Sequence, residues 1–426
     1  MSSPHVAGLF ALLKQAHPDW SAAEAKSALM TSARQDVLSN DRKTQAGPFD
    51  MGSGHVKPGR PGDTGSSFQP GLAYDAGFNE YLGFLCDADR SVFGNPDATC
   101  GSLEADGVPV KATDLNVPSI GVSQLAGTQT VTRTVTSVAK NAGVLRYDAQ
   151  VSAPTGYTVS VSPSSLSLNR GQSATFKVTI TNVSAPVDEW RFGSLTWKEQ
   201  GGHYLVRSPI AVKASQFSAP DEVTGSGVSG SLSFPVQFGY TGPYTAAAHG
   251  LVPATLTHAN VKQDPDQTFD PSDTGAGGAV AHTFNLSNVG VFRAAIPPDA
   301  VDDAEADLDV YVYNPAGEQV ASSTLGGTDE EVTIQDPADG TWTVYVHGWQ
   351  APGGDTNYTL YSWSVSNAPG GNLTVDSAPT SATIGEKDTI GISWSGATDG
   401  QWHLGAVSHN EGSTLLGRTL VEVNNR

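Results

Sequence analysis

The chain has 426 residues, with 43 acidic against 23 basic side chains and a net charge of -20. At about 100 to 200 residues per domain, this length predicts three or four domains. The acidic charge disfavours nucleic acid and anionic membranes as partners because both repel it, and no apolar run reaches the roughly 18 residues of a membrane-spanning helix.

The first 85 residues carry the helical periodicity of the chain. Val6, Leu9 and Leu13 lie on one face of a predicted helix. Ser21 and Glu24 form a capping box ahead of a second helix. A third, short helix is predicted at 78–85, where apolar residues repeat with the same spacing.

From about residue 114 the pattern changes to the alternation of β-strands. In the run from 174 to 182, Phe176, Val178 and Ile180 share one face while the intervening residues are polar. Short strands of this kind, bounded by turns, predict an antiparallel β-sandwich at 114–215.

A second all-β segment follows a Ser- and Gly-rich stretch at 216–231. Strands that alternate at 308–312 and 342–346, with Pro- and Gly-containing turns, predict a jelly roll at 216–370. A break at 368–372 separates it from a small β unit at 371–426, in which Ile390, Ile392 and Trp394 share a face.

The two cysteines of the chain are Cys86 and Cys100. Their spacing permits a disulfide in an oxidising compartment without establishing one. A metal site is not expected from two cysteines that have no histidine nearby.

The chain opens with the run Met1-Ser2-Ser3-Pro4-His5-Val6-Ala7-Gly8. This run resembles the segment that follows the nucleophilic serine in subtilisin-like serine proteases, which reads Ser-Met-(Ala/Ser)-x-Pro-His-Val-Ala-Gly. A nucleophile at a helix amino terminus gains from the partial positive charge there, and proline is tolerated in a first helical turn. The resemblance implies that the nucleophile, the catalytic His and Asp and the oxyanion-hole Asn all precede Met1. The chain alone is therefore expected to be inactive.

The resemblance extends along the chain. Residues 51–86 are similar to the end of the catalytic domain in the cucumisin-like branch of this family, and 114–138 resembles the opening of its fibronectin-III-like domain. The strands at 307–318 and 339–349 resemble bacterial pre-peptidase C-terminal domains. The implied fold class is mostly β: a helical remnant of an α/β subtilisin domain at 1–113, followed by the sandwich, the jelly roll and the small β unit.

Three features leave alternatives open. His5 could be a catalytic base, but its place in the motif indicates a structural histidine. Asp307 and Asp309 end an acidic cluster that calcium could bind, although a solvated strand edge also carries such charges. The aromatic residues of the 311–363 region could form a sugar- or protein-binding face or could pack inside the core; they are Tyr311, Tyr313, Tyr345, Trp349, Tyr358, Tyr361 and Trp363.

These observations predict the C-terminal part of a secreted subtilisin-like serine endopeptidase, acting on protein or peptide substrates. No cofactor is required, and calcium is a possible ligand. Because the first residues lack the features of a signal peptide, the export signal is expected upstream of Met1. A polymer or cell surface could be the ligand of the β domains. The alternative is a non-enzymatic secreted binding protein built on the β-sandwiches.

Overall fold

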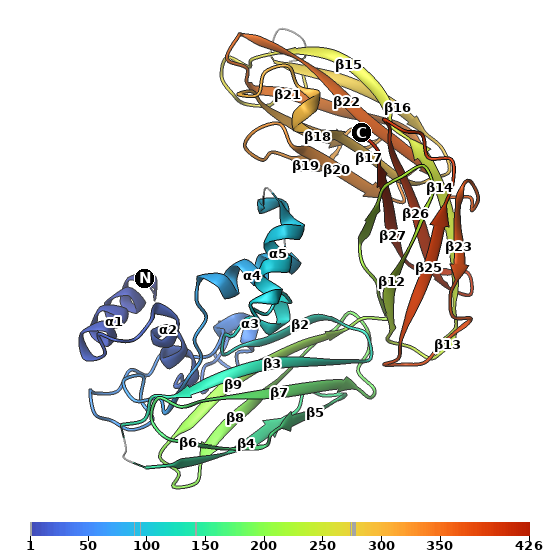
Figure 1. The fold of residues 1–426 in the computed structure, drawn as a ribbon. Helices are drawn as coiled ribbons and strands as arrows, with labels where there is room; N and C mark the ends of the chain where they lie inside the picture. Colours follow the sequence, from blue (N-terminus) through green and yellow to red (C-terminus); the bar gives the residue numbers. More distant parts are fainter. Residues whose placement is uncertain (1, 89, 94, 141–142, 273, 275–277) are drawn as a thin grey trace. The chain divides into compact units, whose positions relative to one another are not determined.

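The computed structural model describes residues 2–88, 90–93, 95–140, 143–272, 274 and 278–426 (Figure 1). The chain divides into two compact units. Unit 1 comprises Met1–Ser218 with the short pieces 238–240 and 383–386, and unit 2 comprises the remainder. Strands predominate, and within the described residues the α-helices all lie in the first part, so the predicted fold class is confirmed.

Among the described residues, the helical part of unit 1 contains five α-helices, which include the three predicted ones. The helices are α1 (Ser2–Ala16), α2 (Ala22–Thr31), α3 (Pro48–Met51), α4 (Phe78–Ala88) and α5 (Pro96–Ala105). Helix α2 begins at the predicted capping box, since Ser21 and Glu24 each bond the other's backbone amide. The His17 ring stacks on Trp20 after α1 ends, at a centroid distance of 3.8 Å.

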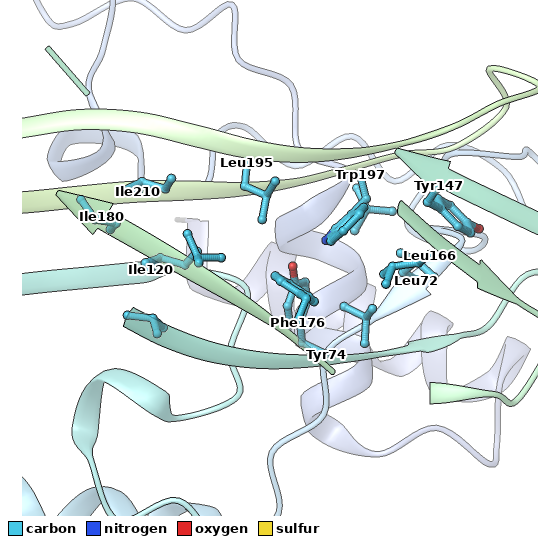
Figure 2. Packing of buried hydrophobic residues seen from close by; sticks show 14 of the residues in the cluster. Leu72, Tyr74, Ile120, Tyr147, Leu166, Phe176, Ile180, Leu195, Trp197 and Ile210 are labelled. Atoms are coloured by element: carbon cyan, nitrogen blue, oxygen red, sulfur yellow. The ribbon is translucent and has the colours of Figure 1, made fainter. Parts of the chain in front are cut away.

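A β-sandwich forms the rest of unit 1. One sheet has the order β1-β3-β7-β5 and the other β2-β9-β8-β4-β6. The strands are β1 (Leu72–Ala73), β2 (Ile120–Leu125), β3 (Thr128–Ser137), β4 (Leu145–Ser152), β5 (Tyr157–Ser162), β6 (Ser165–Leu168), β7 (Ser173–Asn182), β8 (Trp190–Glu199) and β9 (Leu205–Ala214). Pairing is antiparallel except for β2 with β9, which run parallel. The inward faces pack around Phe176 and Trp197, as the alternation predicted (Figure 2).

The helical segment and the sandwich share this core. Strand β1 pairs with β3, and Leu72 and Tyr74 are buried among the sandwich residues. Arg133 of β3 is 3% exposed and donates hydrogen bonds to the carbonyls of Thr113, Val117 and Ser119. The chain on both sides of the expected boundary at 113 is therefore attached to the sandwich. Strand β1 forms backbone hydrogen bonds with β3, and the buried guanidinium of Arg133 finds its acceptors in the carbonyls of 113–119.

Unit 2 contains two layered sheet pairs. The second sandwich, at 255–366, has the sheets β15-β22-β17-β20 and β16-β21-β18-β19 around a core that includes Phe292, Val310 and Val344. Its strands are β15 (Thr255–Lys262), β16 (Ala279–Leu286), β17 (Val289–Ile296), β18 (Asp307–Tyr313), β19 (Gln319–Ser323), β20 (Glu330–Gln335), β21 (Gly340–Gln350) and β22 (Asp355–Ser366).

The third sandwich combines strands from both ends of unit 2. Its sheets contain β12-β25-β23 and β11-β27-β26-β14. The strands are β11 (Glu222–Gly225), β12 (Gly230–Phe238), β14 (Thr245–Pro253), β23 (Leu373–Ser377), β25 (Lys387–Trp394), β26 (Trp402–Glu411) and β27 (Thr414–Asn424). The remaining strands are short, and they are β10 (Phe217–Ser218), β13 (Gly242–Pro243) and β24 (Ser381–Ala382).

Residues 371–426 therefore do not form sheets of their own. Strand β25 pairs with β12 from Lys387 to Trp394, and β26 pairs with β14. The stretch at 216–231 also contributes strand β11, which runs parallel to β27. A sheet must bury its apolar face against another sheet. In the third sandwich, the strands that precede the second sandwich and the strands that follow it form these two sheets together.

Among the described residues, no helix is both long and apolar enough to cross a membrane.

Candidate functional site

The motif residues lie on α1, at the start of unit 1. Ser3, Pro4, His5 and Gly8 are exposed, whereas Leu13 on the opposite face is buried against α2 and Trp20. Met1 lies outside the described residues, and nothing is described of the Ser2 side chain. A Cβ atom added at Gly8 would meet nothing within 4 Å. The motif face of α1 is thus open within this chain.

An apolar groove runs along this face. Its volume is about 1160 Å³, and α1 lines one side while residues 54–58 line the other. Leu12 is 51% exposed at its edge. The lining residues are Pro4, His5, Val6, Gly8, Leu9, Leu12, Gly54, His55, Val56 and Pro58.

Two histidines of this region have structural contacts. The Nε2 atom of His17 is 2.8 Å from the Phe68 carbonyl oxygen, and Nδ1 of His55 is 2.9 Å from the Val56 carbonyl oxygen. His5 is exposed and lines the groove.

A disulfide joins Cys86 to Cys100. Cys86 lies on α4 and Cys100 on α5, and both are buried with Leu103. The bridge holds the two helices together beside a small apolar cluster.

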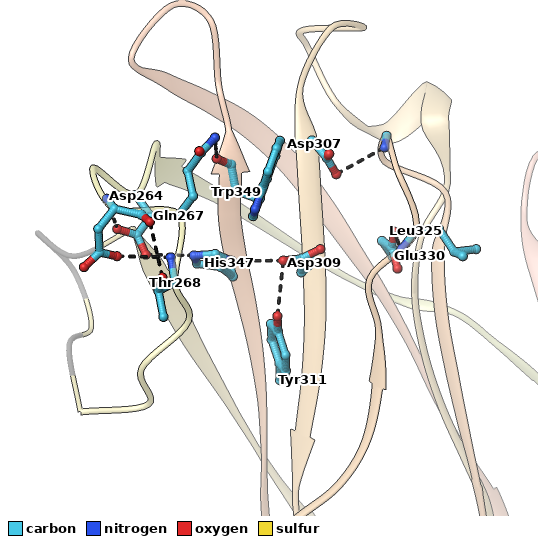
Figure 3. A network of polar contacts seen from close by, with 12 residues as sticks. Asp264, Gln267, Thr268, Asp307, Asp309, Tyr311, Leu325, Glu330, His347 and Trp349 are labelled. Carbon is cyan, nitrogen blue, oxygen red and sulfur yellow. Dashed lines mark hydrogen bonds and ion pairs between the residues drawn. The ribbon is translucent and has the colours of Figure 1, made fainter. Parts of the chain in front are cut away.

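A polar site lies on the second sandwich, where His347 lies between two carboxylates (Figure 3). Its Nδ1 is 3.0 Å from Asp309 Oδ2 on the adjacent strand, and its Nε2 is 2.9 Å from Asp264 Oδ2 in the β15–β16 connection. His347 is 1% exposed, and both aspartates are also buried. Burial alone would lower the pKa of His347, but the hydrogen bonds to the two aspartates raise it above its usual value.

The acidic pair expected to bind calcium lies beside this histidine. Asp309 also accepts a hydrogen bond from the Tyr311 hydroxyl, and Asp307 accepts one from the Gly327 amide. Burial raises the pKa of Asp307. Within the described ranges, no three His, Cys, Asp or Glu side chains are arranged to hold a metal ion, so calcium binding stays a prediction.

Glu330 was not singled out by the sequence. It is 1% exposed, it accepts a hydrogen bond from the Leu325 amide, and burial with the nearby charge of Asp309 raises its pKa to about 7. Its alternation with Val332, which is buried in the same strand, was the signal that could have placed it inward. Asp264 gave no such signal because it lies in a connection.

The aromatic residues divide between core and surface. Tyr358 and Trp363 are buried, whereas Tyr311, Tyr313 and Tyr345 are partly exposed. Phe269 stacks on Tyr311 with a centroid distance of 3.9 Å and an interplanar angle of 6°.

Three family models match separate parts of the chain. The subtilase family model matches residues 1–55, the fibronectin type-III domain model 114–212, and the bacterial pre-peptidase C-terminal domain model 281–348. The predicted resemblance is confirmed in each of these segments, and each model covers less than half of the chain.

The curated relatives are plant subtilisin-like proteases. Subtilisin-like protease SBT2.6 of Arabidopsis thaliana is 36% identical over 228 residues, which cover 50% of this chain and 26% of the relative. Subtilisin-like protease SBT3 of Solanum lycopersicum is 36% identical over 225 residues, covering 49% of this chain and 28% of the relative. The chain thus spans about a quarter of the length of the relatives it matches.

Solved structures resemble the chain only remotely. The Vibrio cholerae VesB protease has 16% identity and a TM-score of 0.17, and the match covers 22% of this chain and 30% of that one. The calcium binding domain CBD12 of CALX1.1 has 9% identity and a TM-score of 0.18, covering 58% of this chain and 79% of that one. Neither likeness carries an argument about function.

Proposed function

We propose that this chain is the C-terminal part of a secreted subtilisin-like serine endopeptidase. The observation that carries the proposal is the open apolar groove on the motif face of α1, within the segment that matches the subtilase family. A groove lined by exposed apolar side chains is typical of a surface that another part of a protein covers. The preceding part of the catalytic domain is the occupant that the groove fits.

In the intact enzyme, a serine next to Met1 would attack the peptide carbonyl carbon while a histidine takes its proton and an aspartate orients that histidine. The acyl-enzyme would then be hydrolysed by water. Helix α1 contributes its amino terminus, whose partial positive charge stabilises the negative charge that develops on the carbonyl oxygen.

The chain alone is expected to lack peptidase activity. In subtilisin, removal of the nucleophile costs on the order of 10⁶ in kcat. The β domains would then serve the intact enzyme by positioning it or by binding a ligand outside the cell.

The reading frame upstream of the Met1 codon tests this proposal. An in-frame Gly-Thr-Ser immediately before Met1, with Asp and His motifs further upstream, would support it. A stop codon and a ribosome-binding site there would overturn it and favour a non-enzymatic binding protein.

A further inference from the structure

The second and third sandwiches of unit 2 pack against each other. Residues of β17 and β22 form one buried apolar cluster with residues of β26 and β27. Within this cluster, the rings of Trp363 and Trp402 meet edge to face at a centroid distance of 4.6 Å, and Trp363 Nε1 donates to the Trp402 carbonyl at 3.2 Å. We call this contact of β17 and β22 with β26 and β27 the junction.

Arg293 lies on the same face of β17 as two residues of the apolar cluster. Its Nη1 and Nη2 donate to Glu222 Oε1 and Oε2 at 3.0 and 2.6 Å, which is a bidentate pair. Nη1 is also 3.3 Å from Glu422 Oε2, and Nε is 3.2 Å from Glu331 Oε1. Glu222 and Glu422 belong to the third sandwich and Glu331 to the second. The guanidinium of Arg293 therefore connects the two sandwiches across the junction.

The three glutamates carry more charge than one guanidinium can balance. The Arg293 side chain is 2% exposed and that of Glu422 is 17% exposed, so these charges are screened less than at an open surface. Carboxylates that share a site cannot all ionise without a cost, and the cost is relieved when one of them keeps a proton. A protonated Glu422 can also form a hydrogen bond with Glu222, which two carboxylates cannot do. The closed junction therefore favours one retained proton.

We propose that the junction is controlled by a proton: it is tightest while one proton is held among Glu222, Glu331 and Glu422, and it loosens when that proton is lost. The loosening should begin in β11 and β20, which carry two of the three glutamates. Both strands lie at the edges of their sheets, β11 beside β27 and β20 beside β17, so each has less backbone support than an inner strand.

The raised pKa values of two glutamates give the direction of the effect. Burial and the charge of Glu222 raise the pKa of Glu422 to about 7. Burial also raises the pKa of Glu331, with Glu222 and Asp329 acting in the same direction and Arg293 against it. A carboxyl group whose pKa is raised in the closed junction stabilises it fully below the ordinary glutamate value of about 4.3, and this stabilisation is lost as the pH rises through the higher value. The junction should therefore be tight in mildly acidic solution and looser above about pH 7.

The other strands around this group place uncharged residues against it. Leu404 of β26 pairs with Glu422, and Trp363 of β22 pairs with Arg293. On β20, Thr333 Oγ1 accepts a hydrogen bond from Arg293 Nε at 2.9 Å. The charged and titratable groups of the junction are Glu222 on β11, Arg293 on β17, Glu331 on β20, Asp329 just before β20, and a separate pair formed by Arg418 of β27 with Asp336.

Hydrogen–deuterium exchange on the full chain tests the junction. After correction for intrinsic rates, peptides from β11 and β20 should exchange about tenfold faster at about pH 8.5 than at about pH 6. The reason is that only the closed junction holds the proton over roughly one pH unit of this range, and each such unit changes the opening equilibrium about tenfold. Peptides from β7 in unit 1 should be protected equally at both pH values. Equal protection of β11 and β20 at both pH values would overturn the proposal.

Two variants assign the effect to the glutamates. Glu422→Gln keeps the size of the side chain and removes its titration, so the difference between the two pH values should fall from about tenfold to less than about twofold. Glu331→Gln should reduce the difference in the same direction without altering β27. The control is Glu318→Gln, the same substitution at an exposed glutamate of the second sandwich, which should keep the full difference. An unchanged difference in Glu422→Gln, or its loss in Glu318→Gln, would show that the proton is not held at this junction.

Discussion

The hydroxyl oxygens of Tyr74 and Ser208 lie 2.9 Å apart in the core of unit 1. Tyr74 follows the short strand β1 in the helical segment, whereas Ser208 belongs to β9 of the sandwich. Both side chains are buried, and burial raises the pKa of Tyr74 to about 12. The pair joins the helical segment to the sandwich through a buried hydrogen bond.

The first prediction concerns this pair. Tyr74→Phe should lower the free energy of unfolding of unit 1 by about 1–3 kcal/mol, because the buried Ser208 hydroxyl loses its partner. Chemical denaturation of the full chain provides the measurement. Tyr81→Phe, at a position that is 40% exposed, serves as the control and should change stability by less than about 0.5 kcal/mol. An equal effect of both substitutions would contradict the pairing.

The second prediction concerns the disulfide. Cys86→Ser with Cys100→Ser should destabilise the α4–α5 region by about 3 kcal/mol, because the bridge restricts a loop of about 15 residues in the unfolded chain. Hydrogen exchange should show the loss in α4 and α5. The second and third sandwiches of unit 2 should be unaffected, and a loss of protection spread evenly over both units would argue against a local role.

The third prediction concerns Arg293, which is 2% exposed in unit 2. Its guanidinium contacts Glu222, Glu422 and Glu331. Arg293→Gln should cost about 1.5–3 kcal/mol because it removes charged hydrogen bonds and leaves three partly exposed carboxylates without a counter-charge. Lys262→Gln, which removes a positive charge from an exposed position of the same unit, should change stability by less than about 0.5 kcal/mol.

The cost of Arg293→Gln should also depend on pH. Burial and the neighbouring Glu222 raise the pKa of Glu422 to about 7. A carboxyl group with a raised folded pKa stabilises the fold at low pH and loses that contribution as the pH rises. The substitution should therefore be tolerated better at about pH 5 than at about pH 8, and the opposite order would refute the charge explanation.

The fourth prediction concerns His409, which is buried in the third sandwich and bonded to Tyr244 and Thr419. Burial lowers its pKa to about 4. Since an unfolded histidine is protonated below about 6.5, the fold should lose about 3 kcal/mol from this residue as the pH falls from 6.5 to 4. His409→Gln should reduce that slope, whereas the exposed control His258→Gln should preserve it. Unfolding curves across this pH range provide the test.

The sequence predicted the local elements well, because each depends on residues close to one another. The capping box at Ser21 and Glu24 and the alternation around Phe176 both specify a structure through their neighbours. The motif on α1 was likewise readable, since its eight residues are contiguous.

The pairing of strands that are far apart in the sequence could not be predicted from local patterns. The pairing of β12 with β25 joins residues separated by the whole second sandwich, and no local pattern sets that register. The site around His347 could not be predicted for the same reason, because Asp264, Asp309 and His347 come from three separate stretches of the sequence. Single residues such as Asp307 could be suspected, but their partners could not be identified before the strands were placed.

Labelling of the native protein with a serine-directed phosphonate tests the central proposal most directly. We expect one labelled serine, recovered in a peptide in which Met-Ser-Ser-Pro-His-Val follows the modified residue, within a protein considerably longer than 426 residues. A native protein that begins at Met1 and takes up no label would contradict the proposal that this chain belongs to a serine endopeptidase.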